Sequence, residues 1–262
     1  MYGVMFMFWK EWYDMRLRFF IILIVFIFML IMTIAMRPYT STIMDEISEQ
    51  FGNLPDFLKK LVGDPKMLSQ LKNDDFYLLS QWFGKNLGQF LPIIALVIAF
   101  PIFARETEKK TIYFFLSRKK RENVFWSKYI SGLSFTKTLL GTLTILAPVG
   151  MRLAGYNVHF SKPLMILVHE IIAMLFLYSL YIMFSIIFDD QVKPILVGLV
   201  TIFIMPVFSF VESLSFLNIY PYLMGQQIIN DLGIDWNYSI VLLALSFVLI
   251  FIDRKLFMTK EF

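Results

Sequence analysis

Residues 103–129 read FARETEKKTIYFFLSRKKRENVFWSKY. This segment is strongly basic, and long apolar runs precede and follow it. Apolar residues make up 58% of the 262 residues, and phenylalanine alone occurs 29 times, which is more than a water-soluble core can bury. The segment is therefore interpreted as a short charged connection between two membrane spans, and the chain is predicted to be an all-α integral membrane protein.

Six segments are long and apolar enough to cross about 30 Å of hydrocarbon, which takes roughly 20 helical residues. The predicted spans are residues 19–36, 83–104, 129–151, 164–188, 194–211 and 239–252. Helices are expected because lipid cannot satisfy free backbone groups, and because continuous apolar runs do not alternate like barrel strands. We expect one membrane domain over residues 1–262. The first span should be retained, since no cleavage pattern of a signal peptide follows it.

The distribution of Lys and Arg predicts the orientation of the chain. If the N-terminus lies inside, most of the 24 basic residues fall in cytoplasmic segments, as the positive-inside rule requires. Residues 212–238 contain no Lys or Arg, which fits an outer location. We therefore expect a multi-pass protein of the cytoplasmic membrane of a prokaryote, with both termini in the cytoplasm.

Three connecting segments have patterns of their own. Residues 1–18 place apolar and charged residues on opposite sides of a helix, which predicts an interfacial helix or a juxtamembrane turn of the first span. Residues 37–81 repeat apolar residues every three or four positions, with a break near residues 52–55. They predict a helical extracytoplasmic loop that is either a structural lid or a substrate-binding element. Residues 212–238 are too apolar for a free loop, and they predict short re-entrant or interfacial helices.

Residues 105–128 are predicted to form a cytoplasmic loop that contains a short surface helix. Thr111 is the expected N-cap of this helix, and residues 112–116 form its apolar body. The basic residues 118–121 then turn the chain toward the third span. Such a helix can press into a groove on a soluble partner. Alternatively, the basic residues only set the topology and bind anionic lipid head groups.

The loop contains, in order, Glu106, Thr111, Leu116, Ser117, Arg121, Val124 and Lys128. This ordered set resembles the signature of permease subunits of type-2 ABC exporters, in which a Glu ending the second span precedes Gly-Thr, an apolar stretch, a Ser-x-Pro-like turn with Arg, and a Lys. The chain departs from that pattern, since Lys110 stands at the Gly position and the turn has no Pro. A further similarity to the family's Leu-Asn-Pro-aromatic run involves Leu217, Asn218, Pro221 and Tyr222, with Ile219 and Tyr220 intervening.

The resemblance implies a permease subunit of an ATP-driven exporter with six spans. ATP and Mg²⁺ would bind separate ABC ATPase subunits, and no cofactor would bind this chain, which lacks a GxxxxGK phosphate loop followed by Ser or Thr. Further implied partners are a second permease copy or a paralogue, in a homodimer or a heterodimer. Membrane lipids are also expected partners, and nucleic acid is not.

The same resemblance makes the short surface helix a coupling helix. The predicted ATPase-coupling interface consists of Glu106, Thr111, Ile112, Phe114, Phe115, Leu116, Arg118, Lys119, Lys120, Arg121 and Lys128. Glu106 would lie at the membrane edge, where an unpaired charge is costly. It is expected to pair with Arg16, Arg18 or a cation of the partner.

Other ionisable residues lie within or beside the predicted spans. Lys137 is expected to reach the inner surface by snorkelling, with a transport role as the alternative. His169 and Glu170 are expected to be a packing or interface pair, because adjacent helical residues point about 100° apart and cannot form one metal face. Asp189 and Asp190 are expected to be solvated charges of a cytoplasmic turn.

Other classes of function stay open at this point. A secondary transporter could use buried charges for proton coupling, although the sequence contains no paired broken helices or inverted similarity. A lipid-modifying enzyme could use His159, His169 or Glu170, but the chain has no Cys and no GxSxG motif. A third alternative is a membrane anchor or sensor of the same fold, which would not transport a substrate. The spans do not select a substrate among drugs, peptides, lipids and ions.

Overall fold

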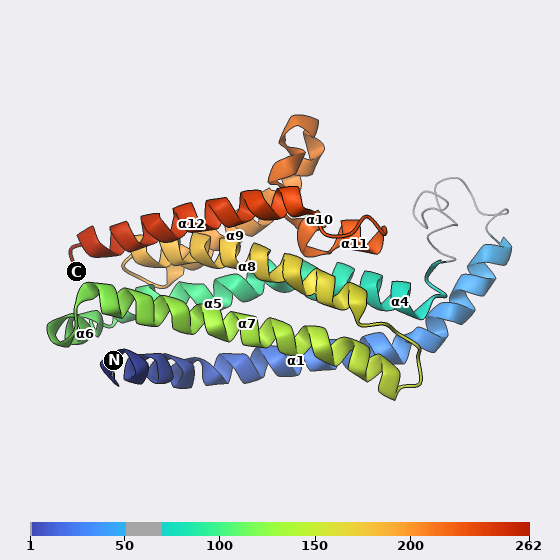
Figure 1. Cartoon of the computed structure of the whole chain (residues 1–262), viewed down its shortest axis with the longest axis horizontal. Coiled ribbons are helices and arrows are strands. Elements are labelled where there is room, and N and C mark those ends of the chain that lie inside the picture. The colour runs from blue at the N-terminus through green and yellow to red at the C-terminus, as the bar shows by residue number, and fades with distance from the viewer. Residues whose placement is uncertain (1, 51–69) are drawn as a thin grey trace.

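The computed structural model describes residues 2–50 and 70–262, and within these residues the chain is helical and contains no strand (Figure 1). The long helices are α1 (Tyr2–Gln50), α5 (Gly88–Glu108), α7 (Arg121–Leu153), α8 (Ser161–Ile187), α9 (Val192–Val207) and α12 (Trp236–Thr259). They lie side by side along the long axis of the molecule, and α8 contacts α5, α7 and α12. The all-α prediction is therefore confirmed.

Short helices connect the long ones. They are α4 (Asp74–Tyr77), the π-helix η2 (Leu78–Leu87), α6 (Ile112–Arg118), the 3₁₀ helices η3 (Phe208–Phe210) and η4 (Glu212–Leu217), α10 (Tyr220–Leu223) and α11 (Gln226–Ile229). Both termini and α6 lie at one end of the bundle, whereas α10 and α11 lie toward the other (Figure 1). In the following, the first of these is called the α6 end.

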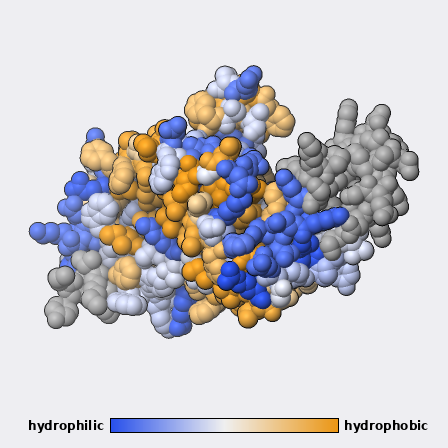
Figure 2. Space-filling view, turned by 45° about the vertical axis from the view of Figure 1, so that its right-hand side comes forward, coloured by the Kyte–Doolittle hydropathy of each residue, from blue (hydrophilic) through white to orange (hydrophobic). Residues whose placement is uncertain are grey.

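Five helical segments of the described residues are long and apolar enough to cross a membrane. They are Phe8–Thr40, Asp74–Glu108, Arg121–Leu153, Ser161–Ile187 and Val192–Phe210. The sixth predicted span lies within α12, which has 24 residues but is not one of these five. Apolar side chains cover broad patches of the surface, as a lipid-facing exterior requires (Figure 2). The chain is thus a multi-pass membrane protein.

Helix α1 is longer than the first predicted span. It runs without a break from Tyr2 to Gln50, so the interfacial helix predicted for residues 1–18 is not a separate element. The structure has instead the alternative, in which these residues are the first turns of the spanning helix. The physical reason is that no Gly or Pro interrupts the helix between Val4 and Arg37, so nothing bends it.

The second spanning helix begins at Asp74 rather than at residue 83. Asn73 caps it, because its side chain accepts a hydrogen bond from the backbone N–H of Phe76 at 3.0 Å. Both ends of the loop predicted for residues 37–81 are therefore parts of long helices: residues 37–50 belong to α1, and residues 74–81 belong to the second spanning segment. The predicted break near residues 52–55 lies outside the described residues.

The π-helix η2 joins α4 to α5, and α1 holds α4 in place. Arg37 of α1 forms an ion pair with Asp74 at 2.8 Å, and the Tyr77 hydroxyl donates to the carbonyl of Thr33 at 2.7 Å. In η2 each turn holds more residues than an α-turn, since the hydrogen bonds run from i to i+5. The winding of η2 therefore differs from that of α5, which continues it into the bundle.

Close helix packing depends on Gly132 of α7. A Cβ atom at this position would collide with the hydroxyl of Tyr178 on α8 and with the side chain of Ile102 on α5. Three long helices approach one another here at a distance that only Gly permits. The Tyr178 hydroxyl donates to the carbonyl of Tyr129 at 2.9 Å, which fixes the contact further.

The segment between α9 and α12 consists of short helices, as predicted for residues 212–238. η3 and η4 project from the bundle, and α10 and α11 return the chain to it (Figure 1). Gly225 has φ +63°, a left-handed conformation that Gly adopts readily, and it separates α10 from α11. Several apolar side chains of the projecting part, such as Phe210 and Phe216, are exposed.

Candidate functional site

The short helix α6 presents one anchored side and one exposed side. Ile112 is fully buried against the bundle, while Tyr113 and Phe114 are exposed. The guanidinium of Arg118 lies 4.1 Å from the centre of the Phe114 ring, a cation–π contact at the surface. Lys119 and Lys120 follow it and are exposed. The predicted surface helix is thus present, with aromatic and basic side chains facing outward.

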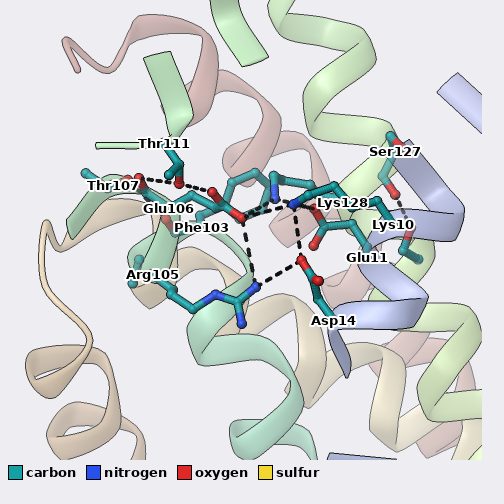
Figure 3. A network of polar contacts seen from close by, with 12 residues as sticks. Lys10, Glu11, Asp14, Phe103, Arg105, Glu106, Thr107, Thr111, Ser127 and Lys128 are labelled. Carbon is teal, nitrogen blue, oxygen red and sulfur yellow. Dashed lines mark hydrogen bonds and ion pairs between the residues drawn. The ribbon is translucent and has the colours of Figure 1, made fainter. Parts of the chain in front are cut away.

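Beneath α6 lies a set of charged side chains, shown in Figure 3 and called the charge network. It consists of Lys10, Glu11, Asp14, Arg105, Glu106 and Lys128. They come from α1, α5 and α7, and the three cations balance the three carboxylates. Because charges cancel locally, the network can be buried at a far lower cost than any of its members alone.

Lys128 is the centre of the charge network, and none of its surface is exposed. Its Nζ atom lies 2.6 Å from Glu11 Oε1 and 3.4 Å from Glu106 Oε1. Both carboxylates are nearly as buried as the lysine. One ammonium group therefore joins α1, α5 and α7. If any of the three helices moved away, a buried charge would lose its partner.

The remaining members close the charge network toward solvent. Lys10 Nζ lies 3.1 Å from Asp14 and 3.8 Å from Glu106, and Arg105 lies 3.6 Å from Asp14 and 3.9 Å from Glu106. Figure 3 shows these four side chains together, with dashed lines marking their contacts. Glu106 thus faces three cations, Lys10, Arg105 and Lys128, all from the chain itself.

Thr111 and Lys110 determine how the chain enters α6. Thr111 precedes the helix as predicted, but its side chain does not cap it; the hydroxyl donates instead to the Glu106 carboxylate. The capping role expected for Thr111 is therefore wrong, because Thr111 has helical backbone angles instead of the extended angles from which an N-cap side chain reaches the first free N–H groups. Lys110 has φ +58°, the left-handed region that favours Gly. The position at which the chain departs from the type-2 pattern is thus one that a Gly would suit.

Phe115 connects α6 to the charge network. Its ring lies 4.8 Å from Lys10 Nζ and 5.1 Å from Lys128 Nζ, measured to the ring centre. A pocket of about 650 Å³ opens beside it, and its lining includes Phe114 of α6 and Arg105 of α5. The pocket combines apolar walls with charges of both signs, which suits a side chain inserted by a protein partner.

Arg121 joins α6 and α7 to the C-terminal helix. It donates to the carbonyls of Met258 at 3.0 Å and Lys260 at 2.7 Å, where α12 ends and its carbonyls lack intrahelical partners. Beside it, Glu122 accepts from Arg254 at 2.7 Å. The start of α7 is therefore clamped to the end of α12.

The structure brings most of the predicted interface residues together at the α6 end, but it divides them by role. Glu106 and Lys128 lie under the helix, Thr111 precedes it and donates to Glu106, and Arg121 binds α12. The outward-facing residues are Phe114, Arg118, Lys119 and Lys120, and those partly covered are Phe115 and Leu116. Ile112 is the buried anchor.

The sequence did not identify the partners of Glu106 correctly. Arg16 lies 3.7 Å from the ring of Tyr13, and Arg18 lies 5.4 Å from the ring of Phe100, so neither pairs with Glu106. Lys10 and Glu11 were assigned to the polar side of a surface helix, whereas Glu11 is buried. One signal could have found it. Glu11 and a second carboxylate, Asp14, precede the long apolar run and are three residues apart, so they lie on one face of the helix, and that face is not the one turned to lipid.

The three ionisable residues that the sequence analysis placed within spans all lie in helices. Lys137 occupies the middle of α7 and is exposed; its role stays a prediction. His169 stacks on Tyr222 with ring centres 4.1 Å apart, and its Nε2 accepts from the backbone N–H of Asp235 at 3.0 Å. Glu170 is fully buried and accepts a hydrogen bond from Thr144 at 3.3 Å. His169 thus packs against the segment before α12.

The turn between α8 and α9 carries the two aspartates expected there. Asp189 pairs with Lys260 at 2.6 Å, and Asp190 pairs with Lys193 at 2.8 Å. The hydrogen bond from Lys193 holds the pKa of Asp190 below its ordinary value. Within residues 2–50 and 70–262, no group of three His, Asp or Glu side chains is placed to hold a metal ion.

Comparison with known proteins gives the family. A family model described as ABC-2 family transporter protein matches residues 5–261. No curated protein and no solved structure matches the chain. The family match covers almost the whole length, including the charge network, α6 and the segment between α9 and α12. The chain therefore belongs to the ABC-2 transporter family, whose members are membrane-spanning permeases of ABC transporters.

Proposed function

We propose that this chain is the permease subunit of an ATP-driven exporter and that α6 is the helix on which a separate ATPase subunit docks. The observation that carries the proposal is a combination of two features. The exposed side of α6 is aromatic and basic, and the charge network beneath α6 is buried and balanced in charge. A helix that serves only to connect two spans needs neither feature.

The surface of α6 suits a protein partner better than lipid alone. Exposed aromatic side chains beside Arg are the residue types that dominate binding energy at protein interfaces. Phe114 and Arg118 meet this description, and the neighbouring pocket of about 650 Å³ offers a place for a side chain of the partner. Lys119 and Lys120 add positive charge that can steer an acidic surface toward the helix.

The contacts beneath α6 provide a route by which a push on this helix can reach the spans. Phe115 and Thr111 connect it to the charge network, and thus to α1, α5 and α7. Arg121 connects the same region to α12. Because the four long helices are tied together at one end, closure of the ATPase subunits would tilt them as rigid elements rather than bend them singly.

In this proposal the α6 end faces the cytoplasm of a prokaryote, α12 is the sixth span, and ATP with Mg²⁺ binds the ATPase subunits. Two permease chains, identical or paralogous, would form the transport unit. The differential affinity of the ATPase for nucleotide in two states would supply the driving force. Most basic residues of the chain gather in the segments assigned to the inner side, which supports this orientation.

The test replaces Phe114 by Ala and measures copurification of an ATPase subunit co-expressed from a neighbouring reading frame. Phe114 is 53% exposed, so the substitution removes surface without opening a cavity. We expect at least about a tenfold loss of affinity, as for a central aromatic residue of an interface. Reversing the charge of Arg118, Lys119 and Lys120 together should have a similar effect.

The matched control is Phe251→Ala on α12, where the side chain is 63% exposed but lies outside α6. This variant should retain the ATPase. Equal copurification with both variants would rule out α6 as the docking helix. Because the chain contains no Cys, a single Cys placed at Lys119 also reports sidedness, and labelling from the outside of intact cells would contradict the orientation.

A further inference from the structure

Two neighbouring cavities lie where α9 and α12 meet the short helices between them. The first, called the polar cavity, has a volume of about 320 Å³, and its lining includes the polar side chains of Asn218, Gln227 and Asp235. The second has a volume of about 400 Å³, and apolar side chains of α8, α9 and α12 form most of its walls. Phe216 and Tyr238 line both cavities, so the two cavities are adjacent.

The polar cavity carries negative charge. Asp235 is the one residue of its described lining with a formal charge at neutral pH when His169 is neutral. The Asp235 carboxylate accepts hydrogen bonds from the backbone of Tyr238 at 3.0 Å and from Gln227 at 2.8 Å. Since a carboxylate can accept about four hydrogen bonds, it has capacity left. Residues 212–238 supply no Lys or Arg to neutralise it.

Aromatic rings surround the same cavity. The rings of Tyr222 and Tyr238 lie with their centres 5.0 Å apart, and both residues belong to the lining together with Phe216. Aromatic faces attract ammonium groups, and they do so more strongly when a carboxylate is close. The lining thus fits a cationic head group better than an anionic one.

The apolar cavity opens sideways between α9 and α12. Val200 and Ile204 of α9 and Val241 and Leu245 of α12 line it, and all four are also exposed at the surface. The segment Val192–Phe210 is one of those able to cross a membrane, so this side faces hydrocarbon. An alkyl chain can therefore enter the groove from the bilayer without passing through water. Both volumes lie in the range of small-molecule sites, about 300–1,000 Å³.

We propose that the two cavities form one binding site for a single-tailed cationic amphiphile, with its amine beside Asp235 and its alkyl tail in the groove between α9 and α12. The Tyr238 hydroxyl donates to the carbonyl of Phe216 at 3.0 Å and so holds η4 over the junction of head and tail. The site is formed by this chain alone. It does not depend on the docking of an ATPase at α6.

The test uses the purified chain in nanodiscs of zwitterionic lipid, without ATPase. A photoreactive dodecylamine is cross-linked, and the labelled peptides are identified by mass spectrometry. Labelling is expected in α9 and in the first half of α12. Dodecyltrimethylammonium should compete with it, and dodecyl sulfate should not. Equal competition by both detergents would overturn the charge assignment and with it the proposal.

Three variants locate the head and the tail. Asp235→Asn keeps an oxygen that can cap α12 but removes the charge, and it should weaken binding of the amine about tenfold, as expected for a charge-assisted contact. Val241→Trp fills the groove and should abolish labelling. Val248→Trp lies two helical turns farther along the same face, outside the groove, and should not change it.

The controls make the outcome independent of folding and of the proposed function. Each variant is compared with the unmodified chain by size-exclusion chromatography before labelling. If Val241→Trp and Val248→Trp label alike, the groove is not the tail site and the proposal is wrong. Loss of ATPase copurification in the α6 variants leaves this result unaffected, because no ATPase is present in the labelling experiment.

Discussion

Helix α7 takes part in two buried polar contacts that differ in kind. Near its start, Lys128 lies between the carboxylates of Glu11 and Glu106 in a set with balanced charges. Farther along, Thr144 donates to Glu170, a buried carboxyl group that no cation of the described residues contacts. The first contact joins three helices by charge, and the second is a single hydrogen bond between two helices.

The difference shows where the bundle depends on electrostatics. Removing one member of a balanced buried set leaves the others without compensation, which costs about 3–5 kcal/mol. Removing or replacing a group held by one neutral hydrogen bond costs about 1 kcal/mol. The α6 end should therefore respond to single charge changes far more strongly than the interior of α8.

The largest effect is expected for Lys128→Met. This change keeps the volume of the side chain but leaves Glu11 and Glu106 buried without their shared cation, so the free energy of unfolding should fall by about 3–5 kcal/mol. The measurement is the thermal unfolding midpoint in detergent micelles. Adding Glu11→Leu to the same chain should restore much of the loss, and a double variant no more stable than the single one would argue against the charge explanation.

An intermediate effect on stability is expected when Glu is replaced by Gln at position 106, and a smaller one when the same replacement is made at position 170. Glu106→Gln removes a carboxylate that faces three cations, but Lys128 keeps Glu11 as its partner, so the free energy of unfolding should fall by about 2 kcal/mol, less than for the loss of the shared cation. Glu170→Gln keeps the shape and an acceptor for Thr144, and it should cost less than about 1 kcal/mol. Chemical denaturation of both variants side by side checks the ranking. Equal losses would mean that Glu170 meets a cation, for example one from a second chain.

The smallest effect is expected for Lys110→Gly. Lys110 has φ +58°, a conformation that costs a side chain about 1 kcal/mol and costs Gly nothing, although Gly also gains freedom in the unfolded chain. The variant should be as stable as the original or up to about 1 kcal/mol more stable. Lys109→Gly, one residue earlier at ordinary φ, is the control and should be destabilised. A loss in the first variant would show that the Lys110 side chain contributes contacts of its own.

The sequence predicted the helical class and the approximate position of each long helix, because continuous apolar runs of about 20 residues have few other solutions in lipid. It did not locate where the spanning segment Asp74–Glu108 and the helix α7 begin. Residues 74–82 and 121–128 are too polar to be recognised as parts of spans, yet they are helical because capping and tertiary ion pairs hold them. Such contacts depend on neighbours that are distant in sequence.

The site was predicted in part for the same reason. The order of residues predicted a helix at α6 and placed Glu106 and Lys128 beside it, but spacing alone does not tell which neighbouring helix the polar side of a helix faces. Glu11 therefore went unrecognised, and Arg121 was assigned to a partner although it binds the carbonyls at the end of α12. Only the packing of α1 and α12 against α7 reveals both.

The π-helix η2 sets how the chain before it is aligned with α5. A π-turn holds more residues than an α-turn, so rewinding Leu78 to Leu87 as an α-helix with the same number of residues would rotate everything before this segment relative to α5. Asp74 would then point away from Arg37. The wide turns of η2 thus set the angular position at which the preceding chain meets α1.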